Sequence, residues 1–575
     1  MTLSRFYILL GVAALVSGCA QQPQPAVEPE PPQASPVSDL KPEPPSRPFD
    51  ADTLYSLLVA ELAGSRGKLD IALANYTQQA RKTRDPQVAE RAYTIARYTR
   101  NQNAALEASL LWAAGDRDDQ DAQAAAILGL IEADRLIEAL EATRHAHTRD
   151  NGALLQSIAA SAREVTPIQR QALLATYREM LTEHPENISL QIGTALLLQQ
   201  QGQIPEAHRL AEQAVQQDAT HTPALILLSG LLHQQQENQK AIALVEHHLA
   251  ARPDDTRLRL QLARLLTFSD LARAQKEFQQ LADSQPHNGD ILLALALVAT
   301  ELGDQQSAEY NYRALLALGS HTNAAHQALG QQALLQQDTD KALEHLLQVT
   351  PGTEFFNTTT QVLGIYLQQG DYAQARAHVD KLAKQFPEQR EPLFLLHSQS
   401  LIEAGEYQSA KDTLDEGLQE FRNSNSLLYA RALLQERQGK VAEAETDLRQ
   451  LLTYDPNNPT ALNALGYILA DNTERYQEAH EYIARALEQQ PDDPATLDSM
   501  GWVLYKLGQP EKAIEYLRRA MDLYPDDEIA AHLGEALWQS NQRDAAREAW
   551  RQGLEINPHS TFISETLERL NVDDF

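Results

Sequence analysis

The sequence predicts an all-α fold, a solenoid in which pairs of antiparallel helices stack on one another. Ala, Leu, Gln and Glu, which favour helices, dominate nearly every window of the 575 residues, and runs typical of strands are almost absent. Proline and alanine recur with a period near 34 residues over most of the chain. One helix pair cannot bury its apolar face alone, so this period predicts stacked neighbours.

Residues 1–18 are predicted to be a secretory signal. The apolar run Phe6–Val16 is too short to span a membrane as a helix. Small residues then precede Cys19, the only cysteine in the sequence. This arrangement resembles a bacterial lipobox, in which the cysteine is acylated and becomes the mature N-terminus. An ordinary cleaved signal followed by an incidental cysteine is the alternative.

The resemblance to lipoproteins also implies a location. Ala20, rather than Asp, follows the cysteine, and by resemblance to sorted lipoproteins this residue points to the outer membrane. Two or more acyl chains make a stable anchor, since each buried methylene contributes about 0.8 kcal/mol. We therefore expect a protein that is anchored in the outer membrane through palmitate-type lipid on Cys19 and faces the periplasm.

Residues 19–50 are predicted to form a Pro-rich, disordered linker. Ten prolines fall in this segment among Glu, Gln and Ser, a composition that favours polyproline II and buries little apolar surface. At about 3.1 Å per residue the linker would reach roughly 90 Å if fully extended. We interpret it as a spacer; a ligand for aromatic grooves is the alternative.

The repeat array is predicted to begin near residue 51, with divergent units over 51–186 and regular units over 187–559. Pro456, Pro491, Pro525 and Pro558 are separated by 35, 34 and 33 residues, and each is expected to end a helix. Alanines twelve residues before most of these breaks mark a close packing position in the second helix of each unit. They are Ala207, Ala241, Ala274, Ala308, Ala342, Ala375, Ala410, Ala444, Ala479, Ala513 and Ala546.

Glycines and aspartates define the ends of the expected helices. Glycines after the first helix are predicted to adopt a left-handed turn, and they are Gly202, Gly303, Gly370, Gly405, Gly439 and Gly508. Asp254-Asp255, Asp492-Asp493 and Asp526-Asp527 follow helix-ending prolines and are expected to cap the next helix. This pattern is that of the tetratricopeptide repeat (TPR), and the array is long enough for about fifteen units. Residues 560–575 are expected to hold a capping helix over Phe562–Leu570 and an acidic tail.

The C-terminal third contains the runs LNALGYILAD from Leu462, DSMGWVLYKLG from Asp498 and IAAHLGEALW from Ile529. Together with the lipobox, linker and array, these runs resemble a proteobacterial family of TPR outer-membrane lipoproteins. The resemblance implies an adaptor that binds and activates a periplasmic carboxy-terminal processing protease and delivers cell-wall hydrolases to it. The alternative is an assembly or regulatory factor for an envelope machine such as a peptidoglycan synthase.

In a TPR hairpin the first helix lines the concave groove, so groove positions can be counted from the packing glycines Gly466, Gly501 and Gly534. The count predicts partner-binding candidates at Asn463, Tyr467, Asp471, Asp498, Trp502, Tyr505, Lys506, Glu535 and Trp538. Tyr and Trp are common interface anchors, although Trp502 and Tyr505 could instead pack against the adjacent unit. Trp550 falls on a second helix and is expected to be a core or cap residue.

Charge and motifs argue against other classes of function. The formal net charge of −31 disfavours nucleic-acid binding; it serves solubility or attracts a basic partner. No motif for metal, nucleotide or acyl-transfer chemistry occurs, so we expect no cofactor, no metal, no small-molecule substrate and no enzyme activity. Lone histidines such as His208, His326 and His378 are expected to be solvated or to cap helices.

Overall fold

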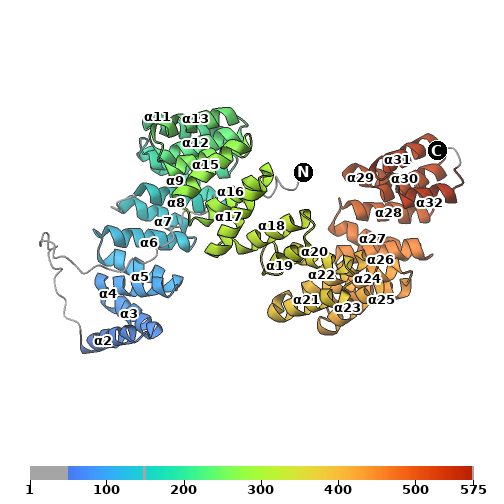
Figure 1. The fold of residues 1–575 in the computed structure, drawn as a ribbon, viewed down its shortest axis with the longest axis horizontal. Coiled ribbons are helices and arrows are strands. Elements are labelled where there is room, and N and C mark those ends of the chain that lie inside the picture. Colours follow the sequence, from blue (N-terminus) through green and yellow to red (C-terminus); the bar gives the residue numbers. More distant parts are fainter. Residues whose placement is uncertain (1–49, 147–150, 573–575) are drawn as a thin grey trace. The chain divides into compact units, whose positions relative to one another are not determined.

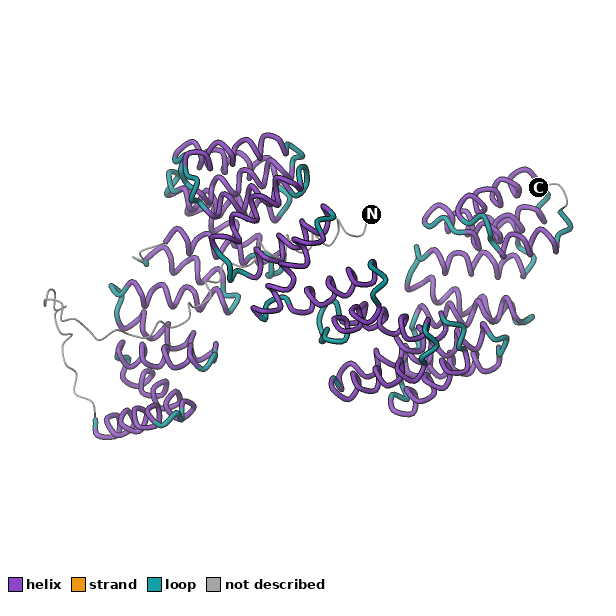
Figure 2. Tube along the Cα trace, viewed as in Figure 1, coloured by secondary structure: helices purple, strands orange, loops and turns teal. Residues whose placement is uncertain are grey.

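The computed structural model describes residues 50–146 and 151–572 (Figure 1). These residues are helical, with turns between the helices and no strand among them (Figure 2). No helix in the described ranges is long and apolar enough to cross a membrane. The predicted signal, the lipidation site Cys19, almost all of the linker and the tail at Asp573 and Asp574 lie outside the described residues.

The chain divides into two compact units, the first of which ends at His321. Its described residues form sixteen α-helices, which follow one another in chain order as eight helical hairpins, one of them irregular. They are α2 (Ala51–Ser65), α3 (Leu69–Thr83), α4 (Pro86–Tyr98), α5 (Gln102–Gly115), α6 (Gln120–Glu132), α7 (Leu136–His145), α8 (Asn151–Ser161), α9 (Pro167–Glu183), α10 (Ile188–Gln200), α11 (Ile204–Gln217), α12 (Thr222–Gln234), α13 (Asn238–Ala251), α14 (Thr256–Leu266), α15 (Leu271–Ser284), α16 (Gly289–Leu302) and α17 (Gln305–Leu318).

The second unit begins at Thr322, and between there and residue 572 the structure shows seven further hairpins and a last single helix. Its elements are α18 (Thr322–Leu335), α19 (Thr339–Leu346), α20 (Phe355–Gln368), α21 (Tyr372–Gln385), the 3-10 helix η1 (Pro387–Gln389), α22 (Arg390–Glu403), α23 (Tyr407–Glu420), α24 (Asn425–Arg437), α25 (Val441–Tyr454), α26 (Pro459–Asn472), α27 (Tyr476–Gln489), α28 (Pro494–Lys506), α29 (Pro510–Leu523), α30 (Asp527–Gln539), α31 (Arg543–Ile556) and α32 (Thr561–Arg569). The eight and seven hairpins together match the fifteen units that the period predicts.

The periodic alanines occupy one structural position throughout the array. Each of the eleven is the fourth residue of the second helix of its hairpin, and all are buried. Opposite Ala479 and Ala513 lie Gly466 and Gly501. A Cβ atom at these glycines would lie 2.9 Å and 3.2 Å from the carbonyl oxygens of Ala479 and Ala513. The first helix can therefore approach the second closely only without a side chain there, which confirms the predicted packing role of these residues.

The predicted helix ends are confirmed at most positions. All six turn glycines have φ between 72° and 80°, in the left-handed region that favours glycine. Asp255, Asp493 and Asp526 cap α14, α28 and α30 by accepting hydrogen bonds from backbone N–H groups in the first turn. The helix α19 is an exception to the pattern of helix-ending prolines, because it ends at Leu346, five residues before Pro351.

The hairpin formed by α8 and α9 departs from the regular pattern. Both helices pack mainly against α10 rather than against each other. Tyr177 of α9 is fully buried, donates a hydrogen bond from its hydroxyl to the carbonyl oxygen of Leu155 (2.5 Å), and covers Gly193 of α10. The Tyr177 ring lies where a Cβ atom at position 193 would be, and α8 and α9 do not form the close antiparallel pair of the regular repeats.

The array ends at α32, which packs against α30 through the buried side chain of Ile563. Trp550 of α31 is fully buried beneath Gly534, as expected for a core residue. These contacts confirm the predicted capping helix to within a residue at each end.

The close contact at Gly501 can be tested by adding one methyl group. We expect Gly501→Ala to lower the free energy of unfolding by about 1–3 kcal/mol, because the new methyl overlaps Leu517 and the Ala513 carbonyl. Gly364→Ala is the matched control: it also lies in a first helix, but nothing lies within 4 Å of its would-be Cβ, so stability should stay level or rise by up to ~1 kcal/mol. Urea unfolding followed by circular dichroism measures both. Equal effects of the two substitutions would contradict the packing role.

Candidate functional site

The nine groove candidates lie on α26, α28 and α30, the first helices of three successive hairpins in the second unit. Helices of this kind are neighbours in space: α26 contacts α28, α28 contacts α30, and α30 contacts α32. The structure places each candidate along this row, and it divides them into side chains packed within the array and side chains that retain exposed surface.

Trp502 is packed within the row and is only 3% exposed. Its ring stacks on the imidazole of His532, with 4.1 Å between centroids, and on the ring of Tyr505 at 5.3 Å. The indole N–H donates to Asp471 (3.1 Å), and the ammonium of Lys506 lies 4.4 Å from the indole ring centroid. Trp502 thus joins three first helices and offers a partner almost none of its own surface.

Asp498 and His532 form a buried pair between α28 and α30. The imidazole Nδ1 donates to both carboxylate oxygens, at 3.0 and 3.1 Å. Burial alone lowers the pKa of His532, but the carboxylates of Asp498, Glu528 and Asp471 outweigh burial and raise the pKa above its ordinary value. The site therefore favours the imidazolium form more than water does, and its charge is favourable beside the face of Trp502.

Tyr467 connects α26 to α30. Its hydroxyl donates to Glu528 (2.6 Å), 61 residues further along the chain. Burial and the nearby carboxylates raise the pKa of Tyr467, so the hydroxyl stays protonated. Burial also raises the pKa of Glu528, which holds no cation within ion-pair distance among the described residues.

Glu535 anchors the end of the row. It is 1% exposed, and it accepts hydrogen bonds from the Tyr505 hydroxyl (3.0 Å) and from both terminal nitrogens of Arg569 on α32. A buried carboxylate without such partners would be strongly unfavourable. Glu535 therefore holds the capping helix α32 in place, and its carboxylate is already bound by residues of the same chain.

The remaining candidates keep part of their surface accessible. Asp471 is exposed, whereas Asn463, Tyr467, Tyr505 and Lys506 are half-buried. Trp538 is also half-buried, between Trp550 and the guanidinium of Arg543, which lies 3.7 Å from its ring centroid. The side-chain oxygen of Asn463 is buried and has no hydrogen-bond partner among the described residues. The row thus presents polar and aromatic edges on a rigid base.

Counting from the glycines did not identify His532, Glu528 or Arg569, which complete this network. His532 follows Asp498 by one repeat length of 34 residues, and that spacing is the signal that could have revealed the pair. His378 was expected to be solvated or to cap a helix, and that prediction is wrong. It is buried, and burial lowers its pKa to about 4.

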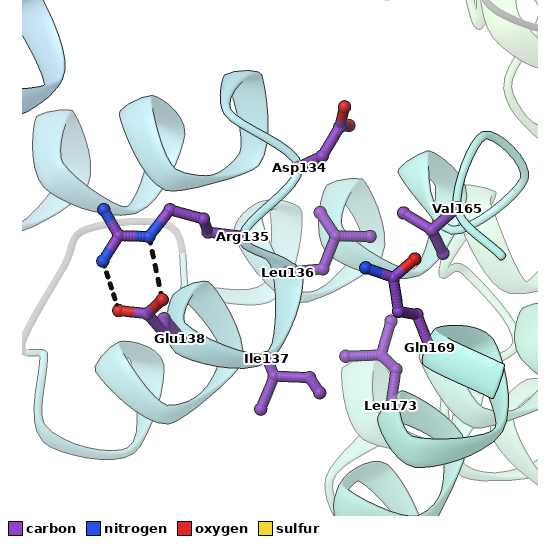
Figure 3. Close-up of a pocket in the computed structure, with 8 residues that line it drawn as sticks. All are labelled: Asp134, Arg135, Leu136, Ile137, Glu138, Val165, Gln169 and Leu173. Carbon is purple, nitrogen blue, oxygen red and sulfur yellow. Dashed lines mark hydrogen bonds and ion pairs between the residues drawn. The ribbon is translucent and has the colours of Figure 1, made fainter. Parts of the chain in front are cut away.

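The first unit contains a separate cavity of about 240 Å³ between α7 and the start of α9 (Figure 3). Leu136, Val165 and Leu173 form its apolar wall, and Gln169 lies beside them. At the other side, Arg135 and Glu138 are paired with each other (2.8 and 2.5 Å). This lining contains no nucleophile next to a base, and no group of three or more His, Cys, Asp or Glu in the described ranges could hold a metal ion.

Comparison with known sequences identifies the repeat. Models of the tetratricopeptide repeat match residues 198–265, 264–323, 366–435, 429–494 and 494–527. A TPR repeat-containing protein of Pseudomonas aeruginosa is 39% identical over 540 residues, which cover 93% of this chain and 91% of that protein.

Solved structures with similar repeats have low overall superposition scores. The hetero-tetramer Cut9–Hcn1 of the APC/C matches 90% of this chain and 96% of its own chain, with 15% identity and a TM-score of 0.32. A thermophilic TPR protein of Thermus thermophilus matches 32% of this chain and 100% of its own, with 22% identity and a TM-score of 0.29.

The Asp498–His532 pair predicts a pH dependence of stability. Because folding raises the pKa of His532, its contribution is fully present below the unfolded pKa near 6.5 and is lost as pH rises through the folded pKa. We expect the difference in unfolding free energy between the natural protein and His532→Gln to be larger at pH 6 than at pH 9.

His397 provides a control of opposite sign. It is buried, and burial together with Arg376 lowers its pKa to about 4, so its neutral form contributes stability above pH 6.5 that is lost as pH falls towards 4. His397→Gln should therefore lose its effect at low pH. Urea titrations across this pH range check both variants, and a His532 effect that grows with rising pH would contradict the assignment.

Proposed function

This chain belongs to the tetratricopeptide repeat family, and from that premise we propose that it is a lipid-anchored periplasmic adaptor for a carboxy-terminal processing protease. Repeats of this family are protein-interaction scaffolds, and family models match such repeats over most of residues 198–527. The row on α26, α28 and α30 supports a docking role, since it combines aromatic edges with charged groups on an interlocked base.

The network of polar contacts beneath this row is the observation that carries the proposal. Three polar contacts connect first helices of different hairpins: Trp502 to Asp471, His532 to Asp498, and Tyr467 to Glu528. A fourth, from Arg569 to Glu535, connects the capping helix α32 to α30. A preorganised surface loses less conformational entropy when a partner binds. An anchor at Cys19 would add a second advantage, because confining the scaffold to a membrane raises the local concentration of captured partners.

The protease partnership can be tested by capture from membranes. The tagged full-length protein should recover a periplasmic serine protease that mass spectrometry identifies. Lys506→Glu should reduce recovery at least about fivefold, since it reverses a charge at the accessible edge of the row. Lys512→Glu is the matched control, because Lys512 is exposed on the second helix α29 and should leave recovery unchanged.

The outcomes of this experiment separate three cases. Recovery of a peptidoglycan synthase without any protease would favour an assembly factor over the protease adaptor. Recovery of no protease, with intact control lipoproteins in the same membranes, would exclude the adaptor function. Equal recovery with Lys506→Glu and Lys512→Glu would keep the adaptor but remove the row as its docking site.

The anchor is tested separately at Cys19. We expect Cys19→Ser to abolish metabolic palmitate labelling and to release the protein from the membrane fraction. The helical array should keep its circular dichroism spectrum, because the array begins only at Ala51. Labelling that survives the substitution would contradict lipidation at Cys19.

A further inference from the structure

Two histidines meet in the first hairpin of the second unit. His326 lies on α18 and His345 on α19, 19 residues apart in the sequence, and both are half-buried. Their Nδ1 atoms are 3.3 Å apart, and their rings are tilted by 46° with 5.5 Å between centroids. His326 is therefore part of a pair, rather than the lone solvated or helix-capping residue that the sequence suggests.

The close packing of this hairpin brings the two imidazoles together. Gly330 follows His326 by one turn of α18, and a Cβ atom at Gly330 would lie 3.3 Å from the carbonyl oxygen of Ala342 on α19. The same Cβ atom would overlap Leu346, the residue next to His345. Because a glycine lets α18 approach α19 so closely, the side chains one turn away from it come into contact.

The repeat itself does not require histidine at these two positions. His326 lies four residues before the packing glycine of its hairpin, where the α28–α29 hairpin has the fully buried Leu497. His345 lies three residues after the buried alanine, where the same hairpin has Tyr516. Both members of the pair thus replace a residue that serves packing alone, which indicates a role beyond the fold.

The distance between the two nitrogens matches the coordination geometry of a tetrahedral metal ion. Zinc binds imidazole nitrogens at about 2.0–2.1 Å, and two such bonds at the tetrahedral angle place the nitrogens about 3.3 Å apart. The same distance is long for a hydrogen bond, since most N–H donors lie about 2.9–3.0 Å from an oxygen acceptor. The observed 3.3 Å therefore suits a shared cation better than a direct bond between the rings.

The protonation state of the pair agrees with this geometry. Burial and the neighbouring His345 lower the pKa of His326, so its neutral imidazole is favoured, and this is the form that binds metal. With the proton of each neutral ring on Nε2, the lone pairs of both Nδ1 atoms point into the space between the rings. Two lone pairs repel each other there, and a cation between them removes the repulsion.

We propose that His326 and His345 bind a divalent transition-metal ion of the zinc class, with water in the remaining coordination positions. Imidazole suits zinc, copper and nickel, whereas Mg²⁺ and Ca²⁺ prefer oxygen ligands. No group of three or more ligating side chains occurs in the described ranges, so this site has two protein ligands and its ion exchanges readily. The bound ion connects α18 to α19 and stabilises this hairpin.

The first test uses the metal-free full-length protein and copper(II)–iminodiacetate as the probe. The chelator fills three coordination positions of copper and leaves room for two imidazoles, so a single histidine binds this probe weakly. We expect one equivalent to bind tightly, with electron paramagnetic resonance couplings from two imidazole nitrogens. Excess Zn²⁺ should displace the probe, because both ions use the same nitrogens.

Three variants connect this binding to the pair. His326→Gln and His345→Gln should each weaken binding of the probe at least about tenfold and leave couplings from one imidazole only. His247→Gln is the matched control, because His247 and His248 form another close pair whose rings are nearly perpendicular, at 87° with 5.1 Å between centroids. Circular dichroism in metal-free buffer checks that each variant keeps its helices.

A second measurement needs no substitution. Zn²⁺ should slow hydrogen exchange of the α19 amides in the natural protein, since an ion that binds only the folded hairpin lowers the population of its open form. Absence of a tight equivalent of the probe, couplings from one imidazole in the natural protein, equal effects of His326→Gln and His247→Gln, or unchanged exchange of α19 would each overturn the proposal. These measurements require neither the protease nor the lipid, so their outcome is independent of the adaptor function.

Discussion

The two helices of a hairpin approach each other so closely that a methyl group at Gly501 would meet the carbonyl oxygen of Ala513. The same contact recurs between Gly466 and Ala479 and between Gly330 and Ala342. Because the contact involves backbone atoms, it cannot relax by a change of rotamer. The contact sets the distance between the two helices of a hairpin. One face of the first helix therefore packs against the second helix of the same hairpin, and another face contacts the first helices of neighbouring hairpins.

The face of each first helix that contacts the neighbouring first helices carries the polar and charged side chains of the candidate site. In the second unit its polar atoms bind one another across repeats, so charged groups such as Asp498 and Glu535 are buried yet satisfied. Removing one member of such a pair is unfavourable, since the other stays buried without its partner. The network therefore gives the concave face a defined shape, and the accessible edges of Tyr467, Asp471 and Lys506 are held in fixed positions.

The sequence predicts the repeated features well because they depend on local backbone constraints. Each of these features depends on the backbone within a few residues. They are the glycines at positive φ, the alanines at the fourth position of the second helices, and the aspartates that cap helices. Burial at the candidate site depends instead on contacts between residues 31, 34 and 61 positions apart. Periodicity places Trp502 on the concave side, but it cannot tell that His532 covers its ring. The loose period over residues 51–186 predicts divergent units there, but it cannot show how α8 and α9 depart from the pattern, since that depends on contacts such as the one between Tyr177 and Gly193.

Equivalent positions of different repeats in this array can therefore carry side chains of different chemistry. Gln199 and Gln200 in α10 occupy the repeat positions that Tyr505 and Lys506 occupy in α28, although one pair lines a cationic hollow and the other an aromatic network. The backbone contact that defines the repeat places no demand on these side chains, because they point away from the second helix. Irregular packing adds to the difference: at α8 and α9 the departure from close pairing brings Arg163 and Arg170 beside α10. A departure of this kind gives one repeat a surface that the regular repeats cannot form.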